Sequence, residues 1–240
     1  MARGHRPSAF EPVRPAPTGR GYPVLGVVDA GGPSYPRHAT RGAKRYLSPM
    51  LFHVHAEDRP GLGSELYDLA EEHWSYMDRF DDRFVLRGPT LTDDGEEHTG
   101  SIHVVEVPDR AAAERFATEE PYWSAGLYAG YTAVRAVVLF DRGRDTDEAE
   151  APHSLVTGAW PPRPRSEGGS DPLPSDTGPG GRLLFAALLV DDGGTHTTGM
   201  IAAVRALPDE AVEVVRPFAD RLADAPAALA AQRWSRGGRN

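Results

Sequence analysis

The chain has 240 residues, 40% of them hydrophobic, and a formal net charge of −9 at pH 7. This length permits one large domain or two small ones. There is no cysteine, which excludes disulfides, Cys-ligated zinc, iron–sulfur clusters and thiol nucleophiles. No apolar run approaches the roughly 18 residues of a membrane-spanning helix, and the N-terminus lacks the pattern of a signal peptide. We therefore expect a cytoplasmic protein with no membrane partner.

Charge and composition divide the chain into regions of different character. Residues 1–49 carry eight basic and two acidic side chains, a balance of +6 that leaves −15 for the remainder. Proline and glycine concentrate in this stretch and over residues 141–181. We expect a disordered N-terminal tail over 1–49 and a Pro- and Gly-rich linker over 141–181. Because the remaining body is strongly acidic, it repels phosphate backbones, and we expect no nucleic-acid partner.

The region 50–140 has a regular alternation of strand and helix patterns. Four segments have the alternating or apolar pattern of strands: 51–58, 83–91, 101–107 and 131–140. Apolar side chains at three- and four-residue spacing predict a helix over 64–80, and Asp109 is placed to cap a second one. The order β-α-β-β-α-β predicts an α+β, ferredoxin-like domain whose first and third strands are neighbours and whose helices cover one face. The open face needs a partner, so we expect a homodimer or an intramolecular pseudo-dimer.

Residues 182–240 resemble the second part of that domain. LTDDGEEHTGSI (91–102) is similar to LVDDGGTHTTGMI (189–201), and VPDRAAAERF (107–116) is similar to LPDEAVEVVRPF (207–218). We interpret the similarity as an internal duplication. Because the region upstream is rich in proline, we expect the second copy to lack the first helix. It is predicted to be a degenerate half-domain with a flexible basic tail, and any catalytic site is expected in the first copy.

Several short motifs occur in a fixed order along residues 58–127. They are Asp58-Arg59-Pro60-Gly61, Glu72-His73, Arg87-Gly88-Pro89, Asp93-Asp94-Gly95 leading to Gly100-Ser101, and Glu120-Pro121-Tyr122 followed by Ala125-Gly126-Leu127. In this order they resemble the YciI-like family of small dimeric α+β barrel proteins. The resemblance implies an active site of one His and one Asp, which fall on His73 and Asp58. One branch of that family removes chloride from chlorinated hydroxyquinols, and most members have no assigned substrate.

The sequence departs from the family pattern at two places. The usual Asp-Pro before the late aromatic residue is Glu120-Pro121, a mild change. His53 and His55 stand in the first strand where apolar or aromatic residues are common. This second departure indicates a specialised ligand pocket.

The residues themselves also favour a pairing of Asp58 with His73. Asp58 ends its strand on the face shared by Phe52, Val54 and Ala56, which we expect the helices to cover. His73 is the polar member of the helix stripe that points at that face. A carboxylate on one imidazole nitrogen leaves the other nitrogen to move a substrate proton. The alternative is a buried structural histidine that bonds a loop carbonyl.

A second group of polar side chains is predicted on the opposite face. His53, His55 and Glu57 project there from the first strand, and Ser101 and His103 join them if Ile102 and Val104 pack under the helices. Three imidazoles and a carboxylate are typical ligands of zinc or nonheme iron. The alternative, which we adopt, is a polar lining for substrate or a hydrogen-bonded cluster at a dimer interface.

The aromatic side chains after the second helix complete the candidate site. Tyr122, with Trp123 and Tyr128, is placed to wall a pocket for a small ligand, or else to pack at the sheet edge. The sequence has no nucleotide-binding loop or nucleophile elbow. We therefore expect cofactor-free proton transfer on a small molecule, such as isomerisation, elimination or dehydrohalogenation, with no bound metal. The alternatives are a noncatalytic ligand-binding protein and a metalloprotein that uses the histidine cluster.

Overall fold

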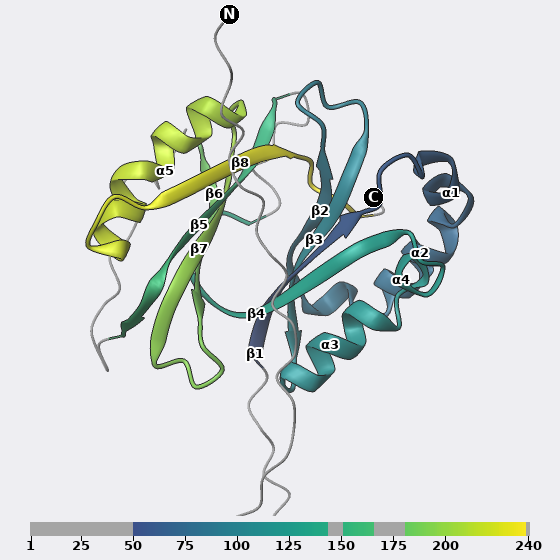
Figure 1. Ribbon diagram of the computed structural model, residues 1–240, viewed down its shortest axis with the longest axis horizontal. Helices are drawn as coiled ribbons and strands as arrows, with labels where there is room; N and C mark the ends of the chain where they lie inside the picture. The colour runs from purple at the N-terminus through teal and green to yellow at the C-terminus, as the bar shows by residue number, and fades with distance from the viewer. Residues whose placement is uncertain (1–49, 144–150, 166–180, 239–240) are drawn as a thin grey trace, which may run out of the picture. The chain divides into compact units, whose positions relative to one another are not determined.

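The computed structural model describes residues 50–143, 151–165 and 181–238 (Figure 1). Within these ranges the strands are β1 (Met50–Asp58), β2 (Phe84–Leu91), β3 (His98–Val107), β4 (Tyr128–Asp141), β5 (His153–Pro164), β6 (Leu183–Val190), β7 (His196–Val204) and β8 (Ala228–Trp234). The helices are α1 (Gly63–Asp68), α2 (Ala70–Asp78), α3 (Arg110–Thr118), α4 (Pro121–Ser124) and α5 (Pro208–Ala223), with a 3₁₀ turn η1 (Asp81–Arg83). None of these helices is long and apolar enough to cross a membrane.

All eight strands pair antiparallel in a closed barrel of order β1-β3-β2-β8-β5-β7-β6-β4. We call β1 to β4 with their helices the first half and β5 to β8 with α5 the second half. The strands of each half lie in the same order, and the first and third strands of each half are neighbours, as predicted for the first half. Two junctions join the halves, β2 with β8 and β4 with β6. The shared strand order agrees with a duplication, which stays a prediction.

The barrel interior is built by both halves. Its fully buried apolar side chains include Leu86, Ile102, Val104, Leu155, Phe185, Ile201 and Trp234, and the rings of His53 and His55 also point into it. The sheet face that we expected a partner to cover is therefore covered within the same chain. A homodimer stays a prediction.

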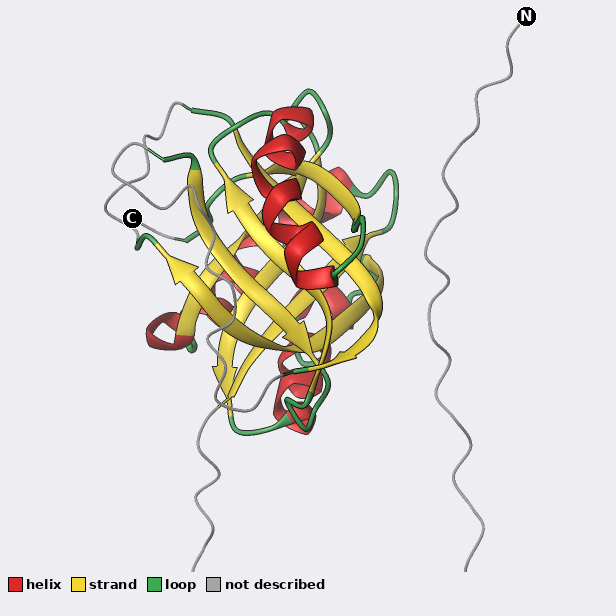
Figure 2. Cartoon of the chain, turned by 90° about the vertical axis from the view of Figure 1, so that its left-hand side faces the viewer, coloured by secondary structure: helices red, strands yellow, loops and turns green. Residues whose placement is uncertain are grey.

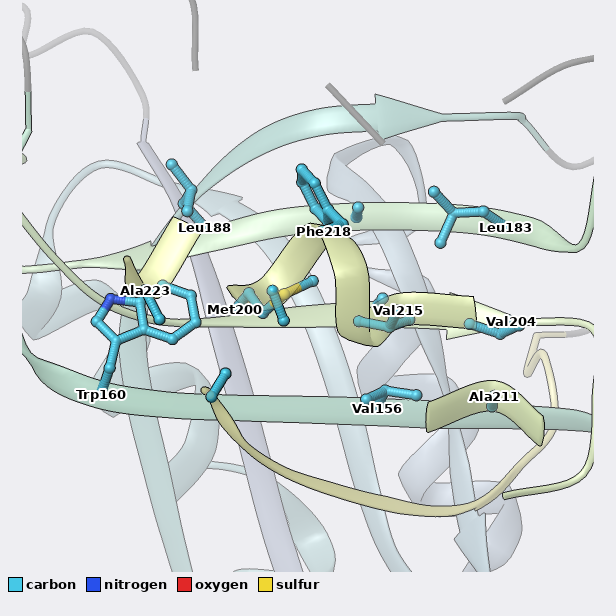
Figure 3. Packing of buried hydrophobic residues seen from close by; sticks show 14 of the residues in the cluster. Val156, Trp160, Leu183, Leu188, Met200, Val204, Ala211, Val215, Phe218 and Ala223 are labelled. Atoms are coloured by element: carbon cyan, nitrogen blue, oxygen red, sulfur yellow. The ribbon is translucent and has the colours of Figure 1, made fainter. Parts of the chain in front are cut away.

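The helices lie outside the barrel, on two separate parts of its surface (Figures 1 and 2). In the first half, Phe52 and Val54 of β1 pack against Met77 of α2 and Phe116 of α3, so the expected covered face of β1 is confirmed. In the second half, α5 is the one helix among the described residues that covers the sheet. Figure 3 shows its Val215 and Phe218 beside Met200, Val156 and other apolar side chains of the strands.

Two expected elements need correction. The stretch 141–181, expected to be linker, contains β5, whose Leu155 and Val156 are fully buried. Its prolines misled the prediction, but they lie in the last four residues of the strand, where its pairing with β7 is irregular. The helix expected over 64–80 is divided at Leu69 into α1 and α2.

The basic C-terminal segment is ordered through residue 238, contrary to the expected flexible tail. Trp234 is 2% exposed, and the backbone N–H groups of Ser235 and Gly237 donate to the carbonyls of Pro89 and Arg87. The segment therefore continues the pairing of β8 with β2 and strengthens that junction of the barrel. The expected tail over 1–49 lies outside the described residues.

Candidate functional site

A buried imidazole–carboxylate pair lies between two helices of the first half. His73 of α2 donates from Nδ1 to Oε1 of Glu120, the residue that caps the N-terminus of α4. The other oxygen, Oε2, accepts from the backbone N–H of Trp123 at 2.9 Å. Glu120 is 2% exposed. The helix cap thus fixes the carboxylate, and the carboxylate fixes the tautomer and direction of the imidazole.

Two tyrosines line this pair. The ring of Tyr122 is stacked on that of His73, with centroids 4.4 Å apart and an interplanar angle of 4°. Tyr128 meets Tyr122 edge to face at 5.7 Å, and its hydroxyl donates to Oγ of Ser101 at 3.2 Å. Burial, together with the nearby negative charge of Glu120, raises the pKa of Tyr122 to about 12 and that of Tyr128 well above its usual value. Both phenols are therefore protonated at neutral pH and act as hydrogen-bond donors.

A second imidazole–carboxylate pair lies at the end of β1. Asp58 accepts at Oδ2 from Nδ1 of His98, the first residue of β3, over 2.5 Å. The pairing of β1 with β4 shifts between Glu57 and Asp58, and places Asp58 opposite Tyr128. Only 5% of the Asp58 side chain is exposed, against 29% for His98. Within the described residues, the other oxygen of Asp58, Oδ1, is buried and has no hydrogen-bond partner.

The predicted contact between Asp58 and His73 is wrong. The side chains have different partners, because α4 brings Glu120 against α2 while the end of β1 lies beside the start of β3. Asp58 does lie on the helix-covered side, as its alternation with Ala56 predicted. The catalytic role expected for His73 and Asp58 stays a prediction.

Ser101 and His103 lie on the other face of β3 from the one predicted. Val54 is the partner of His103 across the β1–β3 pair, so both side chains point under the helices. The His103 ring contacts Phe116 edge to face at 5.2 Å and is 6% exposed. Ile102 and Val104 point into the barrel instead. Burial, with the charge of His73 as the next cause, lowers the pKa of His103 well below its usual value, so it is uncharged.

His53 and His55 point into the barrel, away from His73. Their partners across β1–β3 are Val104 and Ile102, and their rings lie 6.3 Å apart. Burial, with a smaller effect of His55, lowers the pKa of His53 to about 3, and burial also lowers that of His55. The expected cluster of three imidazoles is wrong because His103 lies on the opposite face. Among the residues that the structure describes, no three His, Asp or Glu side chains are arranged to hold a metal.

The family model described as the YCII-related domain matches residues 50–137. This segment is a YCII-related domain. The resemblance drawn from the sequence motifs is thereby confirmed, and the match ends within β4, before the second half begins. No curated protein matches the chain.

Solved structures resemble parts of the chain. One is 5-chloro-2-hydroxyhydroquinone dehydrochlorinase from Burkholderia phenoliruptrix AC1100 in complex with 2,5-dihydroxybenzoquinone, at 27% identity over 41% of this chain and 100% of that one, TM-score 0.34. A proposed monooxygenase from Fusobacterium nucleatum is 11% identical over 80% of this chain and 93% of that one, TM-score 0.46. Another, from Lactobacillus acidophilus NCFM, is 11% identical over 79% and 94%, TM-score 0.44. At these TM-scores none of them assigns an activity to this chain.

Two residues of the YCII-related domain were missed as site residues. Glu120 had a readable signal, because an acidic residue followed by proline is typical of a helix start, and its carboxylate does cap α4. His98 ends the acidic run DDGEEH, which was interpreted as a solvated hairpin. Nothing local distinguishes it, since its partner Asp58 lies 40 residues away in the chain.

Proposed function

We propose that the YCII-related domain catalyses proton transfer on a small organic molecule, with His73 as the acid–base group. The supporting observation is the buried pair of His73 with Glu120. Nδ1 of His73 is committed to the carboxylate, and within the described residues Nε2 has no hydrogen-bond partner. The side chain is 11% exposed, so the ring is buried but not sealed off. An imidazole held in this way is suited to take a proton at Nε2 and return it.

The chemistry needs no cofactor. His73 removes a proton from a carbon or oxygen of the substrate, and the electron pair left behind has two possible fates. It can accept the proton again at another atom, which is isomerisation, or expel a leaving group such as halide or hydroxide, which is elimination. The buried charge of Glu120 stabilises the imidazolium that exists between these steps, because charge interactions strengthen away from water.

Tyr122 and Tyr128 support this assignment. Tyr122 covers one face of the imidazole and is itself held by a hydrogen bond from its hydroxyl to the carbonyl of Leu66 at 2.9 Å. Because the phenol groups stay protonated, His73 is the group of this cluster suited to act as a base near neutral pH. A substrate would meet aromatic surface beside one basic nitrogen, which suits a small molecule with a flat, conjugated part.

Proton exchange tests the proposal without knowledge of the natural substrate. The protein is incubated in D₂O with a panel of small enones, hydroxy-ketones and phenols, and loss of C–H signals is followed by NMR. We expect at least one compound to exchange more than about 10-fold faster with the wild type than with His73→Gln. Glu120→Gln should slow exchange, whereas Glu119→Gln should not, because Glu119 is the exposed neighbour at the end of α3.

The same experiment separates catalysis from simple binding. If panel members bind to the wild type but none exchanges, the domain is a noncatalytic ligand-binding protein. Equal exchange by the wild type and His73→Gln would show that another group acts as the base.

A further inference from the structure

His103 is a buried imidazole whose ring nitrogens have no hydrogen-bond partner within the described residues. Phe84 and Phe116 flank the ring, with centroids 5.4 Å and 5.2 Å from its own. These contacts position the ring without bonding its nitrogens. Because a buried polar group without a partner is unfavourable, His103 needs an explanation that the role proposed for His73 does not supply.

The second half shows that strand pairing and packing do not require a histidine at this place. Across the β2–β3 pair, His103 is the neighbour of Arg87. At the corresponding place in the second half, Ala186 of β6 faces Ala202 of β7, and both are fully buried under α5. Two alanines are therefore sufficient for these positions of the fold, and the polar pair of the first half is an addition to it.

His103 and His73 lie on the same side of the sheet and are connected by side-chain contacts. Tyr122 is stacked on His73 and meets Tyr128, whose hydroxyl donates to Oγ of Ser101. Ser101 lies two residues before His103 on the same face of β3, a separation of about 7 Å along the strand. Burial, then the charge of His73 and then that of Arg87, lowers the pKa of His103. Because charge effects weaken with distance, the two imidazoles lie near enough to contact one small molecule.

Positive charge lies beside His103. The side chain of Arg87 is 7% exposed, and its Nη2 donates to Oδ1 of Asp81 at 2.8 Å, whereas the Asp81 side chain is 57% exposed. Nε of Arg87 is buried and has no partner among the described residues. Because water surrounds much of the Asp81 carboxylate, it compensates the buried guanidinium only in part. A negative charge that develops next to His103 would therefore be stabilised.

We propose that His103 is a second catalytic residue, which donates a hydrogen bond to a carbonyl oxygen of the substrate while Arg87 stabilises the negative charge on that oxygen. The inference rests on the proposed function of His73. It adds the substrate class: a small carbonyl compound that has a C–H group next to the carbonyl. An uncharged imidazole can polarise a carbonyl in this way, because it still carries one N–H donor.

The proton and the electron pairs balance in this reaction. Nε2 of His73 takes the proton from the carbon next to the carbonyl, and the electron pair of that C–H bond forms a C=C bond. The π pair of the carbonyl becomes a lone pair of the enolate oxygen, which accepts the hydrogen bond from His103. His73 then returns the proton to a carbon of the substrate. His103 keeps its own proton throughout, and no atom is oxidised or reduced.

Acetylacetone is the probe for this role, because its enol and enolate differ in ultraviolet absorbance. The pKa of the bound probe is measured in the wild type, His103→Leu, His103→Gln and His196→Leu, with circular dichroism as the check on folding. His103→Leu should raise this pKa by about one unit or more, because the enolate loses its donor. His103→Gln keeps an N–H donor and should retain much of the effect. His196 is a substantially exposed histidine of the second half, so His196→Leu should match the wild type.

Two further variants separate His103 from His73 and from a fault in folding. In the His73→Gln background, His103→Leu should again raise the pKa of bound acetylacetone, because His103 acts on the oxygen and not on the transferred proton. Arg87→Met keeps most of the side-chain stem and removes the charge, so it should raise the same pKa. If His103→Leu does not fold, His103→Gln and Arg87→Met decide the point.

Proton exchange on the carbonyl compounds of the panel gives an independent measurement. His103→Leu should lower kcat about 100-fold and change KM by no more than about threefold, since the hydrogen bond strengthens as the enolate forms. No binding of acetylacetone by the wild type, or the same bound pKa with and without His103, overturns the inference. Exchange that depends on His73 but not on His103 would do so too and leave the proposed function intact. A pKa effect of His103 in a protein without exchange activity would support carbonyl binding and contradict the catalytic role of His73.

Discussion

The helix-covered faces of the two halves differ in chemistry although their strands have the same order. Under α1 to α4, polar side chains are buried among the apolar ones: His73, Ser101, His103 and Glu120. Under α5, the buried cluster consists of hydrophobic residues, with Met200 at the position of Ser101 in the similar segments. Ser154, which is fully buried on the same face of β5 as Val156, is a polar exception and donates to the carbonyl of Ala206 at 2.8 Å. The second half thus shows that this face can be covered without a buried His or Glu among its described residues. Because burying ionisable groups is costly, their presence in the first half supports the proposed function of His73.

The largest expected effect on the free energy of unfolding comes from the apolar cluster under α5. Phe218 of α5 is 3% exposed in the centre of its cluster (Figure 3). Phe218→Ala should lower the free energy of unfolding by about 3–5 kcal/mol, because it removes buried surface and leaves a cavity. Urea unfolding measures the change. Phe218→Leu, which keeps most of the volume, should cost much less, and equal losses for the two variants would contradict the packing.

The barrel interior offers a second comparison. Burial lowers the pKa of His53 to about 3, whereas Leu155 occupies the corresponding position on β5 opposite β7. The folded protein keeps His53 neutral while the unfolded chain binds a proton below its ordinary pKa of 6.5, so stability is complete above that value and falls on acidification. The loss from this one residue should approach about 1.4 kcal/mol per pH unit below pH 6.

Replacing His53 by leucine, the residue at the corresponding position of the second half, should remove the acid sensitivity that His53 causes. His53→Leu is expected to flatten the dependence of unfolding free energy on pH between 6 and 4, measured by urea unfolding. His103 is also buried and uncharged, so some dependence should persist in the variant. An unchanged pH profile would mean that His53 is solvated or bonded in the folded protein.

A smaller effect is expected from removing the polar pair of the first half. Replacing both His73 and Glu120 by Leu should change the unfolding free energy by no more than about 2 kcal/mol in either direction, since apolar residues often substitute for a buried pair without loss. Proton exchange on the panel compounds should nevertheless disappear. Either single replacement should cost more stability than the double one, because it leaves a buried polar partner. Strong destabilisation of the double variant would indicate a structural role instead.

The smallest effect concerns one hydrogen bond. Ser101→Ala removes the acceptor of the Tyr128 hydroxyl and should cost about 1–2 kcal/mol, because the buried phenol is left unbonded. Adding Tyr128→Phe should recover part of that loss. Thermal unfolding of the two variants decides the point, and additive losses would show that the hydroxyl has another partner.

Local patterns predicted most elements of the first half but not its pairing partners. The alternation of β1 identified the covered face of Phe52 and Val54 because the period of two is a property of one strand. The facing of β3 depends on its register with β1, and a shift of one residue reverses every side chain, which is why His103 was placed on the wrong face.

The site contacts were beyond local reasoning for a similar reason. His73 and Glu120 are 47 residues apart, and only the packing of α4 on α2 brings them together. Asp58 and His73 were correctly placed on one side of the sheet. Their shared side does not determine whether the carboxylate of Asp58 or that of Glu120 contacts His73. β5 was missed because its final prolines outweighed the strand pattern of Ser154 to Trp160.

The tautomer of His73 tests the central claim most directly. The nitrogen-15 NMR spectrum of the imidazole is recorded for the wild type, Glu120→Gln and Asp58→Asn. If Glu120 orients His73, the wild type and Asp58→Asn will both show a slowly exchanging Nδ1–H proton, and Glu120→Gln will lose it. Loss of that proton in Asp58→Asn and its persistence in Glu120→Gln would contradict the account.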